Sequence, residues 1–294
     1  MNSTFGISSR EEKLRPSPEG FIPFNGTSLP RPGFDCELTD SLKRELKEAF
    51  ISSVEKRMRG FERVGIMFSG GIDSALIAHV AKRFKSKLFL YSVGTEDSED
   101  IRYAGRFAKE LGLEAKQIIL GEEEVINYYR RLQSLLDEND FMKLELAIPV
   151  FICTEQANKE GVSVMLTGSG AEELFAGYDR HLQCFLNGGD LRKMLHDELR
   201  ALYSKDLKNA ERVASLNHCE LRYPFLDLDF IKVVTSIKPE LNLSRSGEKK
   251  RILKTISIEL GLPAEIAERP KKAMQYGSGI HKVLLQARRK NMVE

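Results

Sequence analysis

The residue types that bind phosphate come together in one six-residue stretch, Ser69-Gly70-Gly71-Ile72-Asp73-Ser74. Glycines permit positive φ and close approach of the main chain, successive N–H groups form a nest for oxygens, and serine hydroxyls add donors. A carboxylate such as that of Asp73 belongs beside a phosphate only if a cation lies between them, and Mg²⁺ bridges such oxygens. The stretch therefore predicts a site for a Mg²⁺-bound phosphate compound. The alternative interpretation is an ordinary strand-to-helix turn that caps a helix.

The residues around this stretch alternate between strand-like and helix-like patterns. Residues 64–68 form a short apolar run that ends at the glycines, and residues 75–84 carry apolar side chains at helical spacing. Further strands are expected at 87–93, 116–120 and 162–167, and further helices at 40–59, 99–111, 122–136 and 145–160. From residue 171 onward only helices and loops are expected. The pattern predicts an α/β fold: an open parallel sheet of about five strands flanked by helices, with a helical C-terminal part.

The strand expected at 162–167 also runs into glycines. If the strand order reverses beside the first strand, the two glycine turns meet at one edge of the sheet. Open α/β sheets bind ligands at such a point. We therefore expect both turns to contribute to one site.

Four motifs, in order along the chain, resemble those of the asparagine synthetase family. The Ser-Gly-Gly-x-Asp-Ser stretch resembles the pyrophosphate-binding loop of the N-type ATP pyrophosphatases. Residues 165–178, M-L-T-G-S-G-A-E-E-L-F-A-G-Y, resemble the second signature of the asparagine synthetases. Residues 220–227, E-L-R-Y-P-F-L-D, resemble their E-x-R-x-P-F-L-D element, preceded by a pair at 211–212 that is similar to their D-R pair. Residues 269–279, R-P-K-K-A-M-Q-Y-G-S-G, are similar to their late lysine and glycine loop.

The resemblance implies an adenine nucleotide alpha hydrolase-like synthetase domain over residues 38–294, with ATP and Mg²⁺ as cofactors. By resemblance, Asp73 and Glu172 would hold Mg²⁺, and Lys271 would meet the leaving pyrophosphate. The ATP site would be formed by residues of both turns and of a neighbouring strand, namely Phe68, Ser69, Gly70, Gly71, Asp73, Ser74, Val93, Thr167 and Gly168.

Substrate binding and further catalytic roles are implied for four more residues. Glu173 and Arg222 would bind the substrate, and Glu220 and Ser169 would be catalytic together with Lys271. Glu220 and Arg222 would form an ion pair, which either closes the substrate pocket or is structural. The alternative for the acidic pair Glu172-Glu173 is a solvated position at a helix start, where acids suit the helix dipole.

Two features depart from the family pattern. The chain begins Met1-Asn2, without the N-terminal cysteine nucleophile of a glutaminase domain. Residues 1–37 are a proline-rich extension, and residues 10–33 faintly resemble the last strands of such a domain. We therefore expect nitrogen from free ammonia or from a separate glutaminase subunit. Ser169 stands where asparagine synthetases carry glutamate and β-lactam synthetases carry tyrosine, and a hydroxyl without an adjacent base is a poor proton acceptor near pH 7.

Composition excludes several classes of protein. With 41% hydrophobic and 30% charged residues, and 45 basic against 43 acidic groups, the sequence is typical of a globular protein without a broad polyanion-binding surface. The basic runs at 249–251, 271–272 and 288–290 are interpreted as solvated faces or phosphate contacts. No apolar run is long enough for a bilayer and no signal peptide is evident, so we expect a cytoplasmic protein. The four cysteines are far apart, which indicates buried thiols rather than a disulfide framework.

The sequence thus favours an AMP-forming, ATP-dependent ligase that adenylates a small carboxylate substrate and transfers the acyl group to ammonia or an amine. A tRNA-modifying or sulfur-transferring ATP pyrophosphatase is one alternative. No two cysteines lie close together in the sequence to relay sulfur, and nucleic acid is not favoured as a partner. A nucleotide-binding subunit without its own chemistry is the other.

Overall fold

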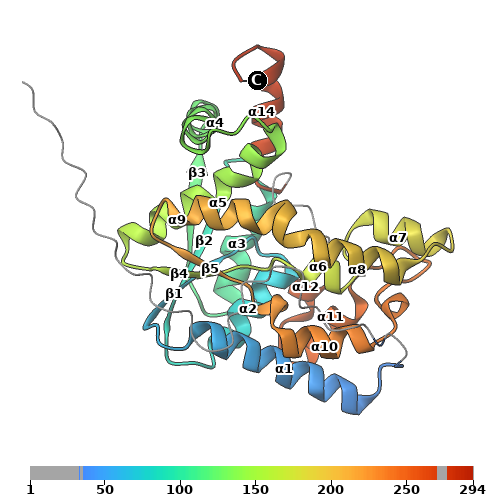
Figure 1. Ribbon diagram of the computed structural model, residues 1–294. Coiled ribbons are helices and arrows are strands. Elements are labelled where there is room, and N and C mark those ends of the chain that lie inside the picture. Colours follow the sequence, from blue (N-terminus) through green and yellow to red (C-terminus); the bar gives the residue numbers. More distant parts are fainter. Residues whose placement is uncertain (1–32, 34–35, 270–276, 294) are drawn as a thin grey trace, which may run out of the picture.

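Five parallel strands form one open sheet in the computed structural model, which describes residues 33, 36–269 and 277–293 (Figure 1). They are β1 (Arg63–Met67), β2 (Lys87–Thr95), β3 (Ala115–Leu120), β4 (Val164–Leu166) and β5 (Glu220–Arg222). The order across the sheet is β3-β2-β1-β4-β5. The predicted open parallel sheet is confirmed, and its strand order reverses beside β1.

Helices of very different length surround the sheet. In chain order they are α1 (Asp40–Met58), α2 (Ile72–Ala81), α3 (Glu99–Glu110), α4 (Glu122–Leu136), α5 (Phe141–Lys159), α6 (Ala171–Leu174), α7 (Asp179–Leu186), α8 (Leu191–Leu202), α9 (Lys208–Ser215), α10 (Leu228–Ser236), α11 (Arg251–Glu259), α12 (Ala264–Ala267) and α14 (Ile280–Arg289). A π-helical turn (Tyr203–Leu207) and two 3₁₀ turns (Pro224–Leu226 and Pro239–Asn242) connect some of them.

Helices cover both faces of the sheet, because the crossovers run in opposite directions along the sheet before and after β3. The connections from β1 to β2 and from β2 to β3 run through α2 and α3, which pack on the strands that they join. The return from β3 to β4 passes over β1 and β2 in the opposite direction, so a right-handed crossover places α5 on the other face. There α5 packs on β1 and β2, and α4 and α9 pack on α5 (Figure 1).

The first helix, α1, packs against α2, α10 and α11. Its Phe50 ring lies 4.9 Å from the ring centroid of Phe225 and 5.3 Å from that of Phe230. Phe175, from the segment after α6, completes this buried aromatic group. The Phe of the 220–227 motif therefore belongs to the core between α1 and α10.

The expectation that only helices and loops follow residue 171 is wrong. β5 lies at 220–222 and pairs in parallel with β4, from Val164–Glu220 to Leu166–Arg222. β5 is three residues long, and Leu221 is its only apolar residue. An edge strand needs one partner only, so it does not require the long apolar run by which the other strands were predicted.

The helix after the first glycine turn begins earlier than expected. The pattern predicted it over 75–84, whereas α2 begins at Ile72, with Gly71 as its N-cap residue, and ends at Ala81. Asp73 and Ser74 therefore lie in the first turn of a helix rather than in a loop. The cause is that Ile72 is buried and already belongs to the apolar face of α2.

Several expectations concern other parts of the chain. Most of the proline-rich segment 1–37 lies outside the described residues. Within it, the main chain of Cys36 forms an isolated parallel β-bridge with Ile237. Cys153 and Cys219 are buried, as expected, and burial raises the pKa of each thiol to about 12, whereas Cys36 is exposed and Cys184 is half-buried. Within the described ranges, no helix has both the length and the apolar character that a membrane crossing requires.

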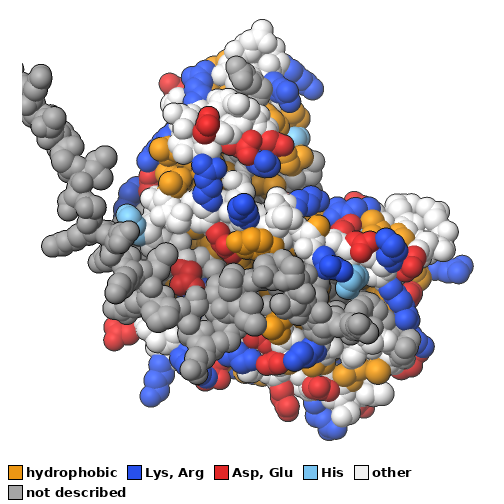
Figure 2. Space-filling model, in the orientation of Figure 1, with side chains coloured by type: hydrophobic (Ala, Val, Ile, Leu, Met, Phe, Trp, Pro, Cys, Tyr) orange, Lys and Arg blue, Asp and Glu red, His pale blue; other side chains and the backbone are white. Residues whose placement is uncertain are grey.

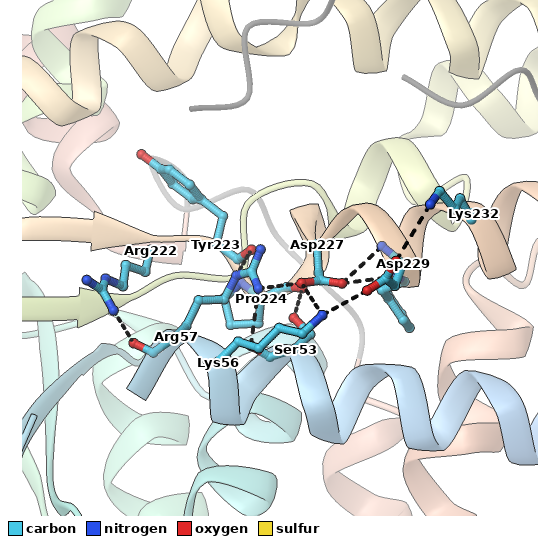
Figure 3. A network of polar contacts seen from close by, with 10 residues as sticks. Ser53, Lys56, Arg57, Arg222, Tyr223, Pro224, Asp227, Asp229 and Lys232 are labelled. Carbon is cyan, nitrogen blue, oxygen red and sulfur yellow. Dashed lines mark hydrogen bonds and ion pairs between the residues drawn. The ribbon is translucent and has the colours of Figure 1, made fainter. Parts of the chain in front are cut away.

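A buried ion pair fixes α1 against the turn after β5 (Figure 3). Arg57 NH1 lies 2.7 Å from Asp227 Oδ2, and Arg57 Nε donates to the Tyr223 carbonyl at 2.9 Å. Asp227 in turn accepts two main-chain N–H groups at the start of α10. Burial lowers the pKa of the Arg57 guanidinium, and the Asp227 carboxylate opposes that shift. One charge pair thus joins α1, the 3₁₀ turn and α10.

We expect Arg57→Met to lower the free energy of unfolding by about 3 to 5 kcal/mol, because it leaves the buried Asp227 without its main cation. The control is Lys56→Met on the same helix, since Lys56 pairs chiefly with the exposed Asp229, at 2.9 Å. An exposed pair contributes about 1 kcal/mol or less. Denaturant unfolding of the two variants measures the difference. Equal loss in both would show that the buried pair does not fix α1.

Candidate functional site

The first glycine turn lies between the carboxyl end of β1 and the start of α2. Gly70 has a φ of +70°, and a Cβ atom there would lie 2.9 Å from main-chain atoms of α3, so only glycine fits. The Gly71 N–H donates to Ser69 Oγ at 3.3 Å, and Ser74 Oγ donates to the Gly71 carbonyl at 3.1 Å. Main-chain N–H groups and the N-terminus of a helix are thereby brought to the sheet edge, an arrangement that binds anions.

The second glycine turn, after β4, packs against the first. A Cβ atom on Gly168 would lie 2.8 Å from Cβ of Asp73, so the two turns are in direct contact. Within the second turn, Thr167 Oγ1 and Ser169 Oγ lie 3.0 Å apart and share a hydrogen bond. The two turns follow neighbouring strands at the point where the strand order reverses, which is the arrangement that the sequence predicted.

A lysine ammonium joins the acidic residues of the two turns. Lys250 Nζ lies 2.7 Å from Asp73 Oδ1, 2.9 Å from Asp73 Oδ2 and 3.1 Å from Glu172 Oε1. The three side chains expose only 5%, 7% and 10% of their surface, respectively. Charges this close attract strongly where water is excluded. We call Asp73, Lys250 and Glu172 the charge cluster.

The backbone around the charge cluster is adapted to it. Lys250 has φ 55° and ψ 32°, a left-handed conformation that costs a residue with a side chain about 1 to 3 kcal/mol. A Cβ atom on Gly177 would collide with the Glu172 carboxylate and with Cε of Lys250. The cluster thus requires a strained residue at one position and a glycine at another.

Lys250 is a site residue that the sequence did not predict. The run 249–251 was expected to be a solvated face or a phosphate contact, and for Lys250 the solvated interpretation is wrong. The residues on either side do pair with surface carboxylates. One signal was present: Lys250 shares the helical phase of Leu253 and Ser257, which are buried on α11.

The charge cluster fits a Mg²⁺ site that is completed by a nucleotide. Carboxylate oxygens are ligands that Mg²⁺ prefers, and the ion is commonly held by one or two carboxylates together with phosphate oxygens and water. Asp73 and Glu172 supply that pair. Within the ranges described, no group of three or more metal-binding side chains comes together, so at the charge cluster the protein itself would supply two carboxylates only. In this structure the ammonium of Lys250 is the cation that the two carboxylates share.

Glu173, the residue after Glu172, faces a different environment. Its carboxylate is buried and accepts a hydrogen bond from the Tyr178 hydroxyl at 3.0 Å. Burial raises the pKa of Glu173, against the effect of that hydrogen bond. The residue lines a mostly apolar cavity between α6, α8 and α10. The alternative in which Glu172 and Glu173 are a solvated pair does not hold, because both are buried.

Glu220 and Arg222 form the expected ion pair, with Arg222 Nε 2.9 Å from Glu220 Oε1. Arg222 also donates to the Arg57 carbonyl at 3.0 Å and lies over the Phe61 ring, 4.6 Å from its centroid. Arg57 belongs to the end of α1 (Figure 3), and Phe61 to the segment before β1. The surroundings favour the structural interpretation of the pair, and its role toward a substrate stays a prediction.

The other predicted site residues divide into three groups. Phe68 is 1% exposed and its ring belongs to the core, and Val93 is also buried, so direct contact with a nucleotide would involve mainly their main chain. Thr167 is buried within the second turn. Lys271 lies outside the described residues.

The surface shows mixed charge on the face drawn in Figure 2, where basic side chains alternate with acidic ones over the described area. This agrees with the nearly balanced composition. The expectation that nucleic acid is not a partner stays a prediction.

Comparison with known proteins agrees with the motifs. The family model of asparagine synthase matches residues 45–189 and 183–293. A Methanocaldococcus jannaschii protein provisionally named as a glutamine-hydrolysing asparagine synthetase is 37% identical over 284 residues, which cover 85% of this chain and 52% of that protein. The human glutamine-hydrolysing asparagine synthetase is 30% identical over 258 residues, covering 84% of this chain and 45% of that protein. The chain thus spans about half the length of these relatives.

A solved structure, that of NMN synthetase from Francisella tularensis, covers 81% of this chain and 78% of its own, with a TM-score of 0.42 and 14% sequence identity. That likeness is weak. The family match, in contrast, extends over both glycine turns, the charge cluster and the 220–227 motif. On that match, the chain belongs to the asparagine synthase family.

Proposed function

We propose that this chain is an ATP-dependent ligase that activates a carboxylate as an acyl adenylate, releases pyrophosphate and transfers the acyl group to ammonia or an amine. The observation that supports this most is the charge cluster, which joins a phosphate-type turn to the acidic turn after β4. Family membership supports the same class of reaction. The cluster brings together the carboxylates that a metal–triphosphate needs and a cation that can meet developing negative charge.

The first turn would hold the β and γ phosphates of ATP. Its glycine N–H groups and the N-terminus of α2 present partial positive charge at the edge of the sheet. Asp73 and Glu172 would hold Mg²⁺ between the two turns. When bound, that ion neutralises phosphate charge and so makes pyrophosphate a better leaving group.

Lys250 would supply positive charge in the transition state. Its ammonium is held by two carboxylates in this structure, and a metal–triphosphate that engages these carboxylates would leave the ammonium beside the phosphates. Negative charge grows there as pyrophosphate departs, and a preoriented cation in a dry site stabilises it. The resemblance assigned this role to Lys271, so variants of each lysine distinguish the two proposals.

The nitrogen donor is proposed as free ammonia or ammonia from a separate glutaminase subunit. The two relatives are named as glutamine-hydrolysing, and this chain corresponds to about half of each. Ser169, hydrogen-bonded to Thr167, has no basic group of its own with which to accept a proton from ammonia. Aspartate is therefore not assigned as the carboxylate that is activated.

The experiment that tests this function follows ATP and Mg²⁺ with a panel of carboxylates and ammonia. Formation of AMP and pyrophosphate that depends on one acid supports the proposal and identifies the substrate. Formation of ADP and phosphate would contradict it.

We expect Asp73→Asn to abolish Mg²⁺-dependent pyrophosphate release while the protein stays folded, because the change removes a charge and preserves the shape of the side chain. Glu172→Gln should have the same effect. Pyrophosphate release is measured with a coupled assay, and circular dichroism checks folding. Turnover at the normal rate would remove the substituted residue from the metal site.

We expect Lys250→Gln to lower kcat by about a hundredfold to a thousandfold, the usual cost of removing one group that stabilises transition-state charge. Lys249→Gln is the matched control, since the Lys249 side chain pairs with the exposed Asp179. Its kcat should be unchanged. The proposal for Lys250 would be wrong if both variants had equal activity in steady-state kinetics.

Ser169→Glu tests whether this position limits transfer of the aspartyl group to ammonia. If ammonia needs a positioned carboxylate, the natural chain should make asparagine from aspartate very slowly and the variant should be faster, since general-base assistance contributes about a hundredfold to ten-thousandfold. Steady-state asparagine formation at saturating ATP and ammonia measures both. Rapid synthesis by the natural chain would show that serine does not prevent the reaction.

A further inference from the structure

Arg269 is held between the first glycine turn and α3. Its NH1 group donates to the carbonyl of Ser69 at 2.6 Å, and its NH2 group lies 2.8 Å from Asp100 Oδ1. The Arg269 and Asp100 side chains are only 4% and 6% exposed. The guanidinium carbon also lies 4.1 Å from the centroid of the Tyr103 ring. None of the roles discussed above uses this arginine.

The bond to the Ser69 carbonyl fixes the direction of a neighbouring N–H group. The described residues contain no cis peptide bond, so the Ser69 carbonyl and the Gly70 N–H point in opposite directions from one planar unit. Because Arg269 binds the Ser69 carbonyl on one side of this peptide unit, the Gly70 N–H points to the opposite side, away from Arg269. The same bond keeps a partially negative oxygen away from any anion bound there.

Asp100 and Tyr103 hold the guanidinium in place. Asp100 lies in the first turn of α3, and Tyr103 follows one turn later on the same helix. The Nε atom of Arg269 is buried and has no hydrogen-bond partner among the described residues. Loss of the Asp100 carboxylate would therefore free the guanidinium from its main anchor. Because Asp100 balances the charge of Arg269, the effect of the arginine on the turn is chiefly one of geometry.

The chain returns to the same place at Gly277. Ser98 Oγ donates to the Gly277 carbonyl at 2.9 Å, and a Cβ atom on Gly277 would collide with the Asp100 carboxylate. Ser278 in turn offers its carbonyl to the Thr95 N–H at 2.8 Å. Arg269 and Gly277, on the two sides of residues 270–276, thus both lie against the start of α3. Asp100 is therefore packed against Gly277 as well as paired with Arg269.

We propose that Arg269 is a positioning residue for the phosphate-binding turn: through the Ser69 carbonyl it orients the N–H groups that bind a polyphosphate, and Asp100 holds it there. The proposal rests on the proposed function only in assigning the β and γ phosphates to this turn. Arg269 should accordingly determine the affinity for ATP and for pyrophosphate, and leave the affinity for AMP unchanged.

Calorimetric binding of a non-hydrolysable ATP analogue, of pyrophosphate with Mg²⁺ and of AMP tests this. In Arg269→Lys, the ATP analogue and pyrophosphate should bind about tenfold to a hundredfold more weakly, as expected for loss of a hydrogen bond from a charged donor. AMP should bind within about twofold of the natural chain. Asp100→Asn should show the same selectivity with a smaller effect, and it carries the test should Arg269→Lys fail to fold.

Arg106→Gln is the matched control. Arg106 also joins α3 to the α12 region, through Glu265, but its side chain is half exposed and it does not contact the turn. The Arg106→Gln variant should bind all three ligands with the affinities of the natural chain.

Two outcomes would overturn the proposal. One is equal affinity for the polyphosphates in the natural chain, Arg269→Lys and Asp100→Asn. The other is an equal loss of AMP and polyphosphate binding together with a lower unfolding midpoint, which would mean a purely structural role. Because binding needs no turnover, absence of carboxylate-dependent AMP formation would contradict the proposed function without deciding the role of Arg269.

Discussion

The site depends on one buried ammonium, that of Lys250, between carboxylates from two different turns. Removing a single ion from water costs several kcal/mol in real proteins, so Asp73 and Glu172 can lie this deep only while a cation accompanies them. Lys250 is that cation here, and its left-handed backbone shows that the chain accepts strain to place it. In the proposed function Asp73 and Glu172 would hold the metal–triphosphate and Lys250 would lie beside its phosphates, which gives a reason for bringing these three charges together.

That arrangement places geometric demands on the rest of the fold. The carboxylates belong to turns after β1 and β4, so these strands must be neighbours, as the reversal of strand order beside β1 makes them. Gly168 lets the two turns touch, and Gly177 leaves room for the Glu172 carboxylate. On the far side of the first turn, Arg269 binds the Ser69 carbonyl. The site is therefore supported from α3, α6 and the start of α11 as well as from the sheet.

The parts of the structure that the sequence predicted are those with a local signal. The apolar run before Ser69 and the glycines after it predicted β1 and its turn, and a similar pattern predicted β4. β5 was missed because three residues with one apolar side chain carry no periodicity, and its pairing with β4 comes from tertiary structure. Lys250 was missed because a basic run suggests solvent, whereas its burial depends on carboxylates that are distant in sequence. Arg222 is the reverse case: a residue predicted to bind the substrate packs against α1 and Phe61, and its role toward a substrate stays a prediction.

The most direct test of the central claim is an experimental structure with Mg²⁺ and a non-hydrolysable ATP analogue. The account predicts the β and γ phosphates on residues 69–74, the ion between Asp73 and Glu172, and the Lys250 ammonium moved from Asp73 to a phosphate oxygen. A triphosphate bound elsewhere, with the Lys250–Asp73 ion pair intact at its present 2.7 Å, would contradict it.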